Sequence, residues 1–242
     1  MLGARTATGG SAAKEGTGSI VARVVDVRAR IARACERASR DPRDITLVGV
    51  TKTVPVDRIR EALDAGVSHV GENRVQDALQ KMRELSDRAP QWHFLGHLQT
   101  NKARVAAEIF DCIESVDSLK LARALEEDAL EIGRALTVYV QVNIGGEESK
   151  GGVPPEEVAG LIDEIDAMPS ILVTGVMSIP PPRLSADDTR RDFRRLKDLF
   201  DGLRSVHPEI VNLSMGMSGD FEIAIEEGAT EVRVGTALFG SR

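Results

Sequence analysis

The stretch Ile45-Thr46-Leu47-Val48-Gly49-Val50-Thr51-Lys52 decides the fold and points to the chemistry. Its apolar and β-branched residues run almost without interruption, which is typical of a strand buried on both faces of a parallel sheet. Lys52 follows at the carboxyl end of this predicted strand, where a charged amine is unexpected. Because desolvation makes an amine give up its proton more readily, a lysine placed here is suited to forming a Schiff base. The alternative is a side chain that extends into water or pairs with a carboxylate.

Beyond Lys52, short apolar runs alternate with longer segments of helical periodicity. Strands are predicted over 45–51, 67–71, 92–96, 111–115, 136–144, 171–178, 210–213 and 231–234. Helices are predicted over 55–65, 73–86, 100–109, 117–132, 154–167, 186–206 and 219–227, with a short one at the C-terminus. Eight strand–helix units in an α/β chain indicate a (β/α)8 TIM barrel. A doubly wound open sheet is the main alternative, but the first strand–helix turn lacks G-x-G-x-x-G.

The segments before the barrel have a different character. Apolar residues at helical spacing predict an extra amphipathic helix over 20–38. Residues 1–17 are rich in Gly, Ala, Thr and Ser and lack periodicity, so we expect a disordered N-terminal tail. No linker composition divides the remainder, and we expect residues 18–242 to form a single barrel domain.

Composition argues against several classes of protein. The formal net charge of -7 disfavours nucleic acid as a partner, because phosphate neutralisation needs clustered Lys and Arg. Cys35 and Cys112 lie far apart, which indicates neither a disulfide framework nor a zinc knuckle and fits a reducing cytoplasm. No stretch approaches the roughly 18 apolar residues of a membrane span, and no signal peptide is evident. We therefore expect a cytoplasmic protein with no membrane partner.

Polar residues cluster at the predicted strand ends, where the catalytic groups of TIM barrels gather. They include Lys52, Glu72, Asn73, His97, Gln99, Asn101, Asn143, Ser178, the stretch 214–218, Gly235 and Thr236. The last two loops place glycines and hydroxyls directly before helices, an arrangement that can bind an anion through exposed backbone N–H groups. Barrels commonly bind phosphate there, although plain helix caps are equally compatible with the pattern.

Three further residues leave alternatives open. Arg233 can point toward the same mouth of the barrel, where its permanent charge would face a ligand, or it can pair with Glu227 or Glu231 on the rim. His93 and His97 form H-x-x-x-H, but on a strand the two rings would not share a face as a metal requires, so no metal site is predicted. Lys150 lies in a glycine-rich loop and is either a solvated charge or a second amine.

These segments together resemble the pyridoxal phosphate homeostasis protein family from about residue 20 to the C-terminus. The matching stretches are Val50-Thr51-Lys52, Gly71-Glu72-Asn73-Arg74-Val75-Gln76, 93–102, Ser149-Lys150-Gly151-Gly152, Gly175-Val176-Met177, 213–218 and 233–240. The resemblance implies a barrel like the alanine racemase N-terminal domain, with pyridoxal 5′-phosphate (PLP) held as an aldimine on Lys52. It also implies phosphate contacts from Met217, Ser218, Gly235 and Thr236, Arg233 at the pyridine nitrogen, and Asn73 and Met177 along the ring.

Two functions remain open at this point: a carrier or buffer in vitamin B6 homeostasis, and a PLP-dependent racemase-like enzyme. A two-base racemase needs a second acid or base opposite the lysine, which alanine racemases take from an additional domain. The single tyrosine, Tyr139, is expected in the core or barrel wall. We therefore favour the non-catalytic carrier, a monomer that delivers the cofactor to apo PLP-dependent enzymes. A lysine-dependent aldolase barrel, which would not require the cofactor, is a third alternative.

Overall fold

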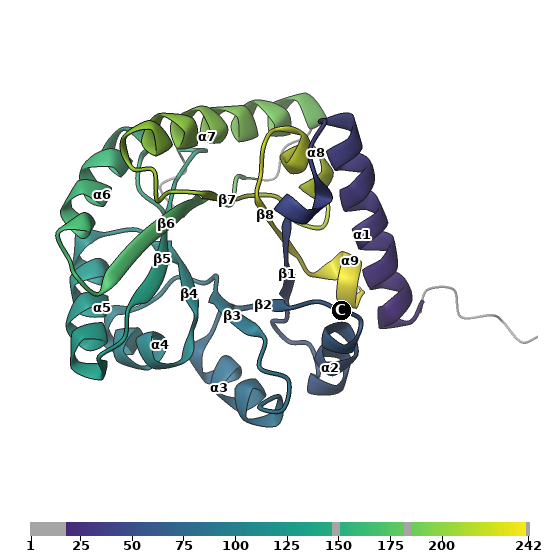
Figure 1. Cartoon of the computed structure of the whole chain (residues 1–242), viewed down its shortest axis with the longest axis horizontal. Coiled ribbons are helices and arrows are strands. Elements are labelled where there is room, and N and C mark those ends of the chain that lie inside the picture. The colour runs from purple at the N-terminus through teal and green to yellow at the C-terminus, as the bar shows by residue number, and fades with distance from the viewer. Residues whose placement is uncertain (1–17, 147–150, 182–184, 241–242) are drawn as a thin grey trace, which may run out of the picture.

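The eight strands form one closed, parallel barrel in the computed structural model, which describes residues 18–146, 151–181 and 185–240 (Figure 1). The strands are β1 (Thr46–Val50), β2 (His69–Glu72), β3 (Gln91–Phe94), β4 (Cys112–Val116), β5 (Leu136–Gln141), β6 (Ile171–Met177), β7 (Asn212–Ser214) and β8 (Glu231–Val234). The barrel closes where β8 pairs with β1, with Val48 opposite Arg233. The predicted TIM barrel is confirmed, whereas the predicted tail and Lys150 lie outside the described residues.

Helices surround the barrel and connect its strands (Figure 1). They are α1 (Ile20–Arg37), α2 (Val56–Asp64), α3 (Val75–Glu84), α4 (Ala103–Ile109), α5 (Leu119–Ile132), α6 (Val158–Asp166), α7 (Ala186–Val206), α8 (Phe221–Glu226) and α9 (Thr236–Phe239). Within the described ranges, none of them is both long and apolar enough to cross a membrane.

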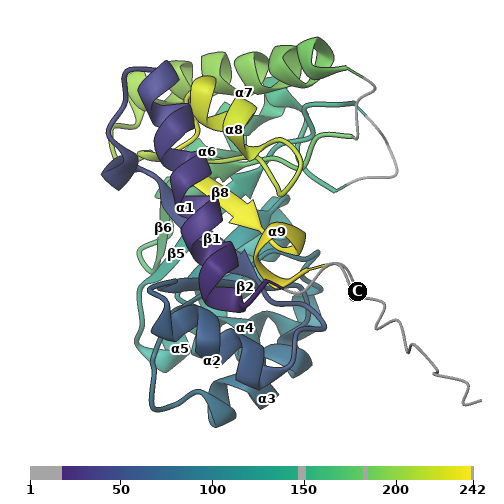
Figure 2. The same ribbon diagram turned by 90° about the vertical axis from the view of Figure 1, so that its right-hand side faces the viewer.

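The extra N-terminal helix α1 lies on the outside of the barrel. It begins where the Ser19 side chain accepts a hydrogen bond from the Ala22 N–H at 3.2 Å, a standard N-cap. Val24, Val27 and Ile31 recur at helical spacing and are buried against the core. Figure 2 shows α1 running past β8 and β1, and it packs on the short helices α8 and α9. It therefore supplies apolar cover where the last two helices are short.

Two strands end at residues other than those predicted, because the pairing between strands and the apolar sequence pattern do not end at the same residue. β5 stops at Gln141 rather than at residue 144, because Val142 makes only an isolated bridge to Val153. β7 spans Asn212–Ser214 rather than 210–213, so Ser214 belongs to the sheet. This places its hydroxyl inside the barrel, where the sequence had indicated only a loop.

Candidate functional site

A cavity of about 910 Å³ opens at the carboxyl ends of β1 and β8, a size suited to a small organic ligand. Six of the eight predicted site residues line it: Lys52, Met217, Ser218, Arg233, Gly235 and Thr236. Arg58 of α2 also lines the cavity, although no motif in the sequence indicates a role for this residue. Among the described lining residues there are three cationic side chains and no carboxylate, so the cavity is suited to an anion.

Lys52 is fixed through its neighbour Thr51. The Thr51 N–H donates to the Gly71 carbonyl at 2.9 Å, and the Thr51 hydroxyl donates to Glu72 Oε1 at 2.6 Å. Lys81 then donates from Nζ to the Thr51 carbonyl and to Glu72 Oε1, at 2.7 and 2.6 Å. Thr51 and Glu72 are fully buried, whereas the Lys52 side chain is only partly buried at the cavity edge. The buried network therefore anchors the backbone from which Lys52 reaches the cavity.

Ser218 lies in the loop between β7 and α8, next to the start of α9, and lines the same cavity as Lys52. Its Oγ accepts hydrogen bonds from the N–H groups of Gly235 and Ala237, at 3.1 and 3.2 Å. Hydroxyls and backbone N–H groups thus converge at one point of the cavity, as an anion site requires. The Ser218 hydroxyl therefore caps two of the N–H groups at the start of α9, and a ligand could bind these two N–H groups only by displacing that hydroxyl.

The backbone of Met217 is engaged differently from the sequence prediction. Its N–H donates to Asp220 Oδ1 at 2.6 Å rather than facing the cavity unpaired. Burial raises the pKa of Asp220, while the hydrogen bond from Met217 and the charge of Arg233 oppose that rise. A phosphate could use the Met217 N–H only after displacing the Asp220 carboxyl group.

Arg233 points into the barrel and not onto its rim. Its Nη2 donates to the Ser178 carbonyl at 2.7 Å, its Nη1 donates to Ser214 Oγ, and the residue is only 3% exposed. The rim alternative is wrong, since Glu227 pairs with Arg190 and Arg194 instead. The guanidinium therefore forms part of the inner wall of the cavity.

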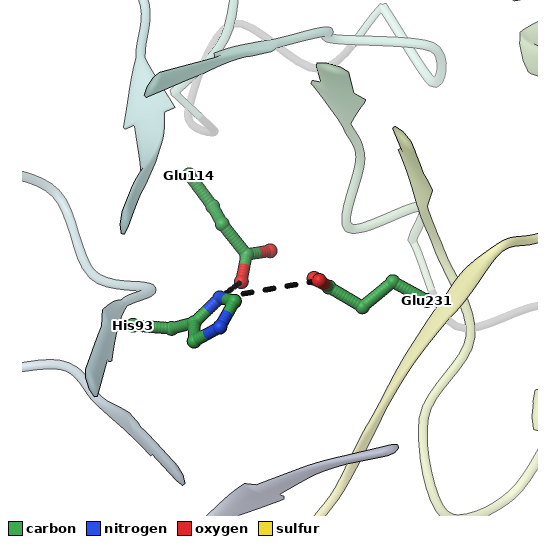
Figure 3. Close-up of side chains that lie close together, drawn as sticks. All are labelled: His93, Glu114 and Glu231. Atoms are coloured by element: carbon green, nitrogen blue, oxygen red, sulfur yellow. Dashed lines mark hydrogen bonds and ion pairs between the residues drawn. The ribbon is translucent and has the colours of Figure 1, made fainter. Parts of the chain in front are cut away.

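Below the cavity, a histidine and two glutamates meet inside the barrel (Figure 3). His93 Nδ1 lies 2.7 Å from Glu114 Oε1 and 4.0 Å from Glu231 Oε2, and all three residues are buried. Burial would lower the pKa of His93, but the hydrogen bond to Glu114 and the charge of Glu231 raise it. Burial and the neighbouring Glu114 raise the pKa of Glu231 to about 8. The pKa of Glu114 shifts in the opposite direction. Burial alone would raise it, but His93 and Arg233 outweigh burial and lower it.

This buried cluster was missed by sequence reasoning, which considered His93 only as a partner of His97. The two histidines do not converge: His97 is exposed beside Asp117, at 3.7 Å, whereas His93 lies in the barrel interior. The direct hydrogen bond between His93 and Glu114 explains the cluster without an ion. Alternation along β8, which puts Glu231 and Arg233 on one face, was the available signal.

Tyr139 lies in the core, as predicted. It is 4% exposed and donates from Oη to Glu231 Oε2 at 3.3 Å. Burial, with Glu231 nearby, raises the pKa of Tyr139 far above its usual value, so this phenol does not ionise readily. Met177 is fully buried beside Tyr139 and Cys112, and Asn73 is exposed after β2. Neither Met177 nor Asn73 lines the cavity, so their predicted ring contacts stay predictions.

Comparison with known proteins agrees with this geometry. The family model described as alanine racemase, N-terminal domain, matches residues 26–242. A pyridoxal phosphate homeostasis protein of Aquifex aeolicus is 45% identical over 221 residues, covering 91% of this chain and 97% of that protein. The structure of PipY from Synechococcus elongatus with PLP bound has a TM-score of 0.81 and 38% identity, covering 91% of this chain and all of that one.

A more distant likeness shows the fold alone. An alanine racemase of Clostridium difficile has a TM-score of 0.71 at 18% identity, covering 90% of this chain and 60% of that enzyme. The high identity to the homeostasis protein, over nearly the whole of both chains, is the more specific finding. The chain therefore belongs to the pyridoxal phosphate homeostasis protein family, which is built on the barrel of the alanine racemase N-terminal domain.

Proposed function

We propose that this chain binds PLP in the cavity between β1 and β8 and acts in vitamin B6 homeostasis as a carrier or buffer of the cofactor. One observation carries the proposal. An amine on Lys52 shares a cavity with the hydroxyl and backbone N–H groups around Ser218 and Gly235. An aldehyde that carries a phosphate needs these two features together, and the donor set therefore fits the group.

Each lining residue has a distinct task in this arrangement. When bound, PLP supplies an aldehyde that condenses reversibly with a primary amine, and Lys52 is the amine at hand. Ser218 and Thr236 offer hydroxyls to the phosphate, and the Gly235 backbone lies beside them. Arg233 would lie at the pyridine nitrogen, where a cationic guanidinium would disfavour protonation of that nitrogen. A ring with an unprotonated nitrogen would be a weak electron sink.

A storage role fits the described cavity better than catalysis. Proton abstraction would need a second acid or base opposite Lys52, and Tyr139 is committed to Glu231 in the core. We therefore infer that the cofactor is held in exchangeable form, in a cytoplasmic monomer, for release to apo PLP-dependent enzymes. Sedimentation of the purified chain tests the monomer, and reconstitution of an apoenzyme tests delivery.

The experiment for the function is an absorbance titration of the protein with PLP. We expect a saturable band from the Lys52-linked cofactor, which Lys52→Ala abolishes and which the exposed control Lys120→Ala retains. Pyridoxal, which lacks the phosphate, should bind more weakly than PLP, and Ser218→Ala should reduce this difference. An unchanged band in Lys52→Ala would contradict the assignment. Racemisation of L-alanine should be negligible, and turnover of about 1 to 1000 per second would favour an enzyme.

A further inference from the structure

A chain of hydrogen-bonded side chains runs through the barrel interior and ends at the cavity. Arg233 donates to Ser214 Oγ, and Ser214 Oγ donates to Glu114 Oε2 at 2.7 Å. Glu114 Oε1 lies 2.7 Å from His93 Nδ1, and His93 Nε2 lies 3.0 Å from His69 Nδ1. His69 lines a smaller cavity of about 250 Å³ at the amino ends of β1 and β2. The polar chain thus spans the barrel from one end to the other.

Such an interior is unusual for this fold, because bulky apolar side chains normally fill TIM barrels in layers. Glu114 is fully buried, and its Oε2 lies 3.8 Å from Arg233 Nη1. Buried charges of this kind stabilise a protein little better than apolar residues of similar volume. A functional demand on Arg233, the one member of the polar chain that lines the larger cavity, accounts for the arrangement.

We propose that Glu114 is a positioning residue that holds Arg233 in the cavity wall through Ser214, and that the adjoining His93 and Glu231 make this hold respond to pH. Ser214 carries the contact because its hydroxyl accepts from the guanidinium and donates to the carboxylate. The inference rests on the proposed function, since the ligand that interacts with the charge of Arg233 is the anionic cofactor.

The direction of the pH response follows from the charges. As the pH rises through about 8, Glu231 loses its proton, because burial and Glu114 have raised its pKa to that value. Glu231 lies two residues from Arg233 on the same face of β8, so the added negative charge offsets the positive charge of Arg233 and an anion binds less tightly in the cavity. The other titratable or charged groups around His93, Glu114 and Glu231 are His69 on β2, Asp111, Cys112 on β4, Tyr139 on β5 and Arg233 on β8. Burial raises the pKa values of Cys112 and Tyr139, which therefore stay neutral in this range.

The test uses pyridoxine 5′-phosphate, which has the ring and phosphate of the cofactor but no aldehyde. Its dissociation constant, measured calorimetrically from about pH 6 to about pH 9, is independent of covalent attachment to Lys52. The variants are Glu231→Gln, which cannot ionise, and Ser214→Ala, which breaks the contact to Arg233. Cys112→Ala is the matched control, because it removes buried volume from the same barrel interior without changing charge. Thermal unfolding confirms that each variant is folded.

For the wild-type protein we expect the dissociation constant to rise with pH, by at most about tenfold per pH unit for one linked proton. The Glu231→Gln profile should be flatter, Ser214→Ala should bind more weakly with a reduced slope, and Cys112→Ala should follow the wild type. Phosphate titration is common to all four proteins, so the differences between profiles are decisive.

Two results would overturn the inference while leaving the proposed function intact. One is coincidence of the Ser214→Ala and Glu231→Gln profiles with that of the wild type. The other is a divalent metal bound at one per wild-type chain and lost from Glu231→Gln. By contrast, failure of the wild-type protein to bind either this probe or PLP at any pH would overturn the proposed function as well.

Discussion

Replacing Lys81 with methionine should destabilise the barrel near Lys52. Lys81 is 9% exposed, and its Nζ donates to Glu72 Oε1 at 2.6 Å and to the Thr51 carbonyl at 2.7 Å. Lys81→Met keeps most of the side-chain volume but leaves a buried carboxylate without its cation. The second carboxylate oxygen, Glu72 Oε2, already has no hydrogen-bond partner among the described residues.

The expected cost follows from the burial of the pair. Removing one partner of a buried ion pair typically costs about 3–5 kcal/mol. Glu72 keeps its hydrogen bond from the Thr51 hydroxyl, so we expect the lower end, about 3 kcal/mol of the free energy of unfolding. Because whole domains are stable by only about 5–15 kcal/mol, this loss is large enough to measure.

Urea unfolding measures this loss, with Arg43→Met as the control. Arg43 also pairs with a carboxylate, Asp41, but its side chain is 89% exposed, so its removal should leave the midpoint unchanged. Adding Glu72→Leu to Lys81→Met should recover much of the stability, because an apolar pair no longer buries a charge. A Lys81→Met protein within about 1 kcal/mol of the wild type would refute the reasoning.

Three further predictions concern pH, ligand binding and backbone conformation. Wild-type stability should fall between about pH 6 and pH 8, since folded Glu231, with a pKa of about 8, holds a proton that the unfolded chain has released. Glu231→Gln should flatten this slope by up to about 1.4 kcal/mol per pH unit in unfolding titrations. Arg58→Gln should weaken PLP binding about 2- to 5-fold in the absorbance titration, with unchanged stability, because it removes a cation from the cavity. Gly216→Ala should cost at least about 1–2 kcal/mol by thermal unfolding, because Gly216 has a φ of +93° and an added Cβ would lie 2.5 Å from Ala224 Cβ.

The barrel and most of its cavity could be predicted because their signals are local. The apolar run before Lys52 marks a buried strand, and glycine with serine before a helix marks an anion site. Six predicted site residues consequently line one cavity. Strand ends were less predictable, since Val142 continues the apolar pattern of β5 without continuing its ladder.

The barrel interior could not be predicted, because it depends on which distant strands face one another. Glu114 and Ser214 are 100 residues apart and meet only through closure of the barrel. The hydrogen bond from the Met217 N–H to Asp220 could not be predicted either, because it depends on the conformation of the turn between these two residues. Arg58 reaches the cavity through the orientation of α2, to which its own sequence context gives no clue.

The most direct test of the central claim is to locate the covalent link between PLP and the protein. The protein is incubated with PLP, reduced with borohydride, digested, and its peptides are weighed by mass spectrometry. We predict one reduced pyridoxyl phosphate group on the peptide that contains Lys52, at the edge of the cavity. An unmodified Lys52, with the label spread over lysines outside the cavity such as Lys102 and Lys120, would contradict the account.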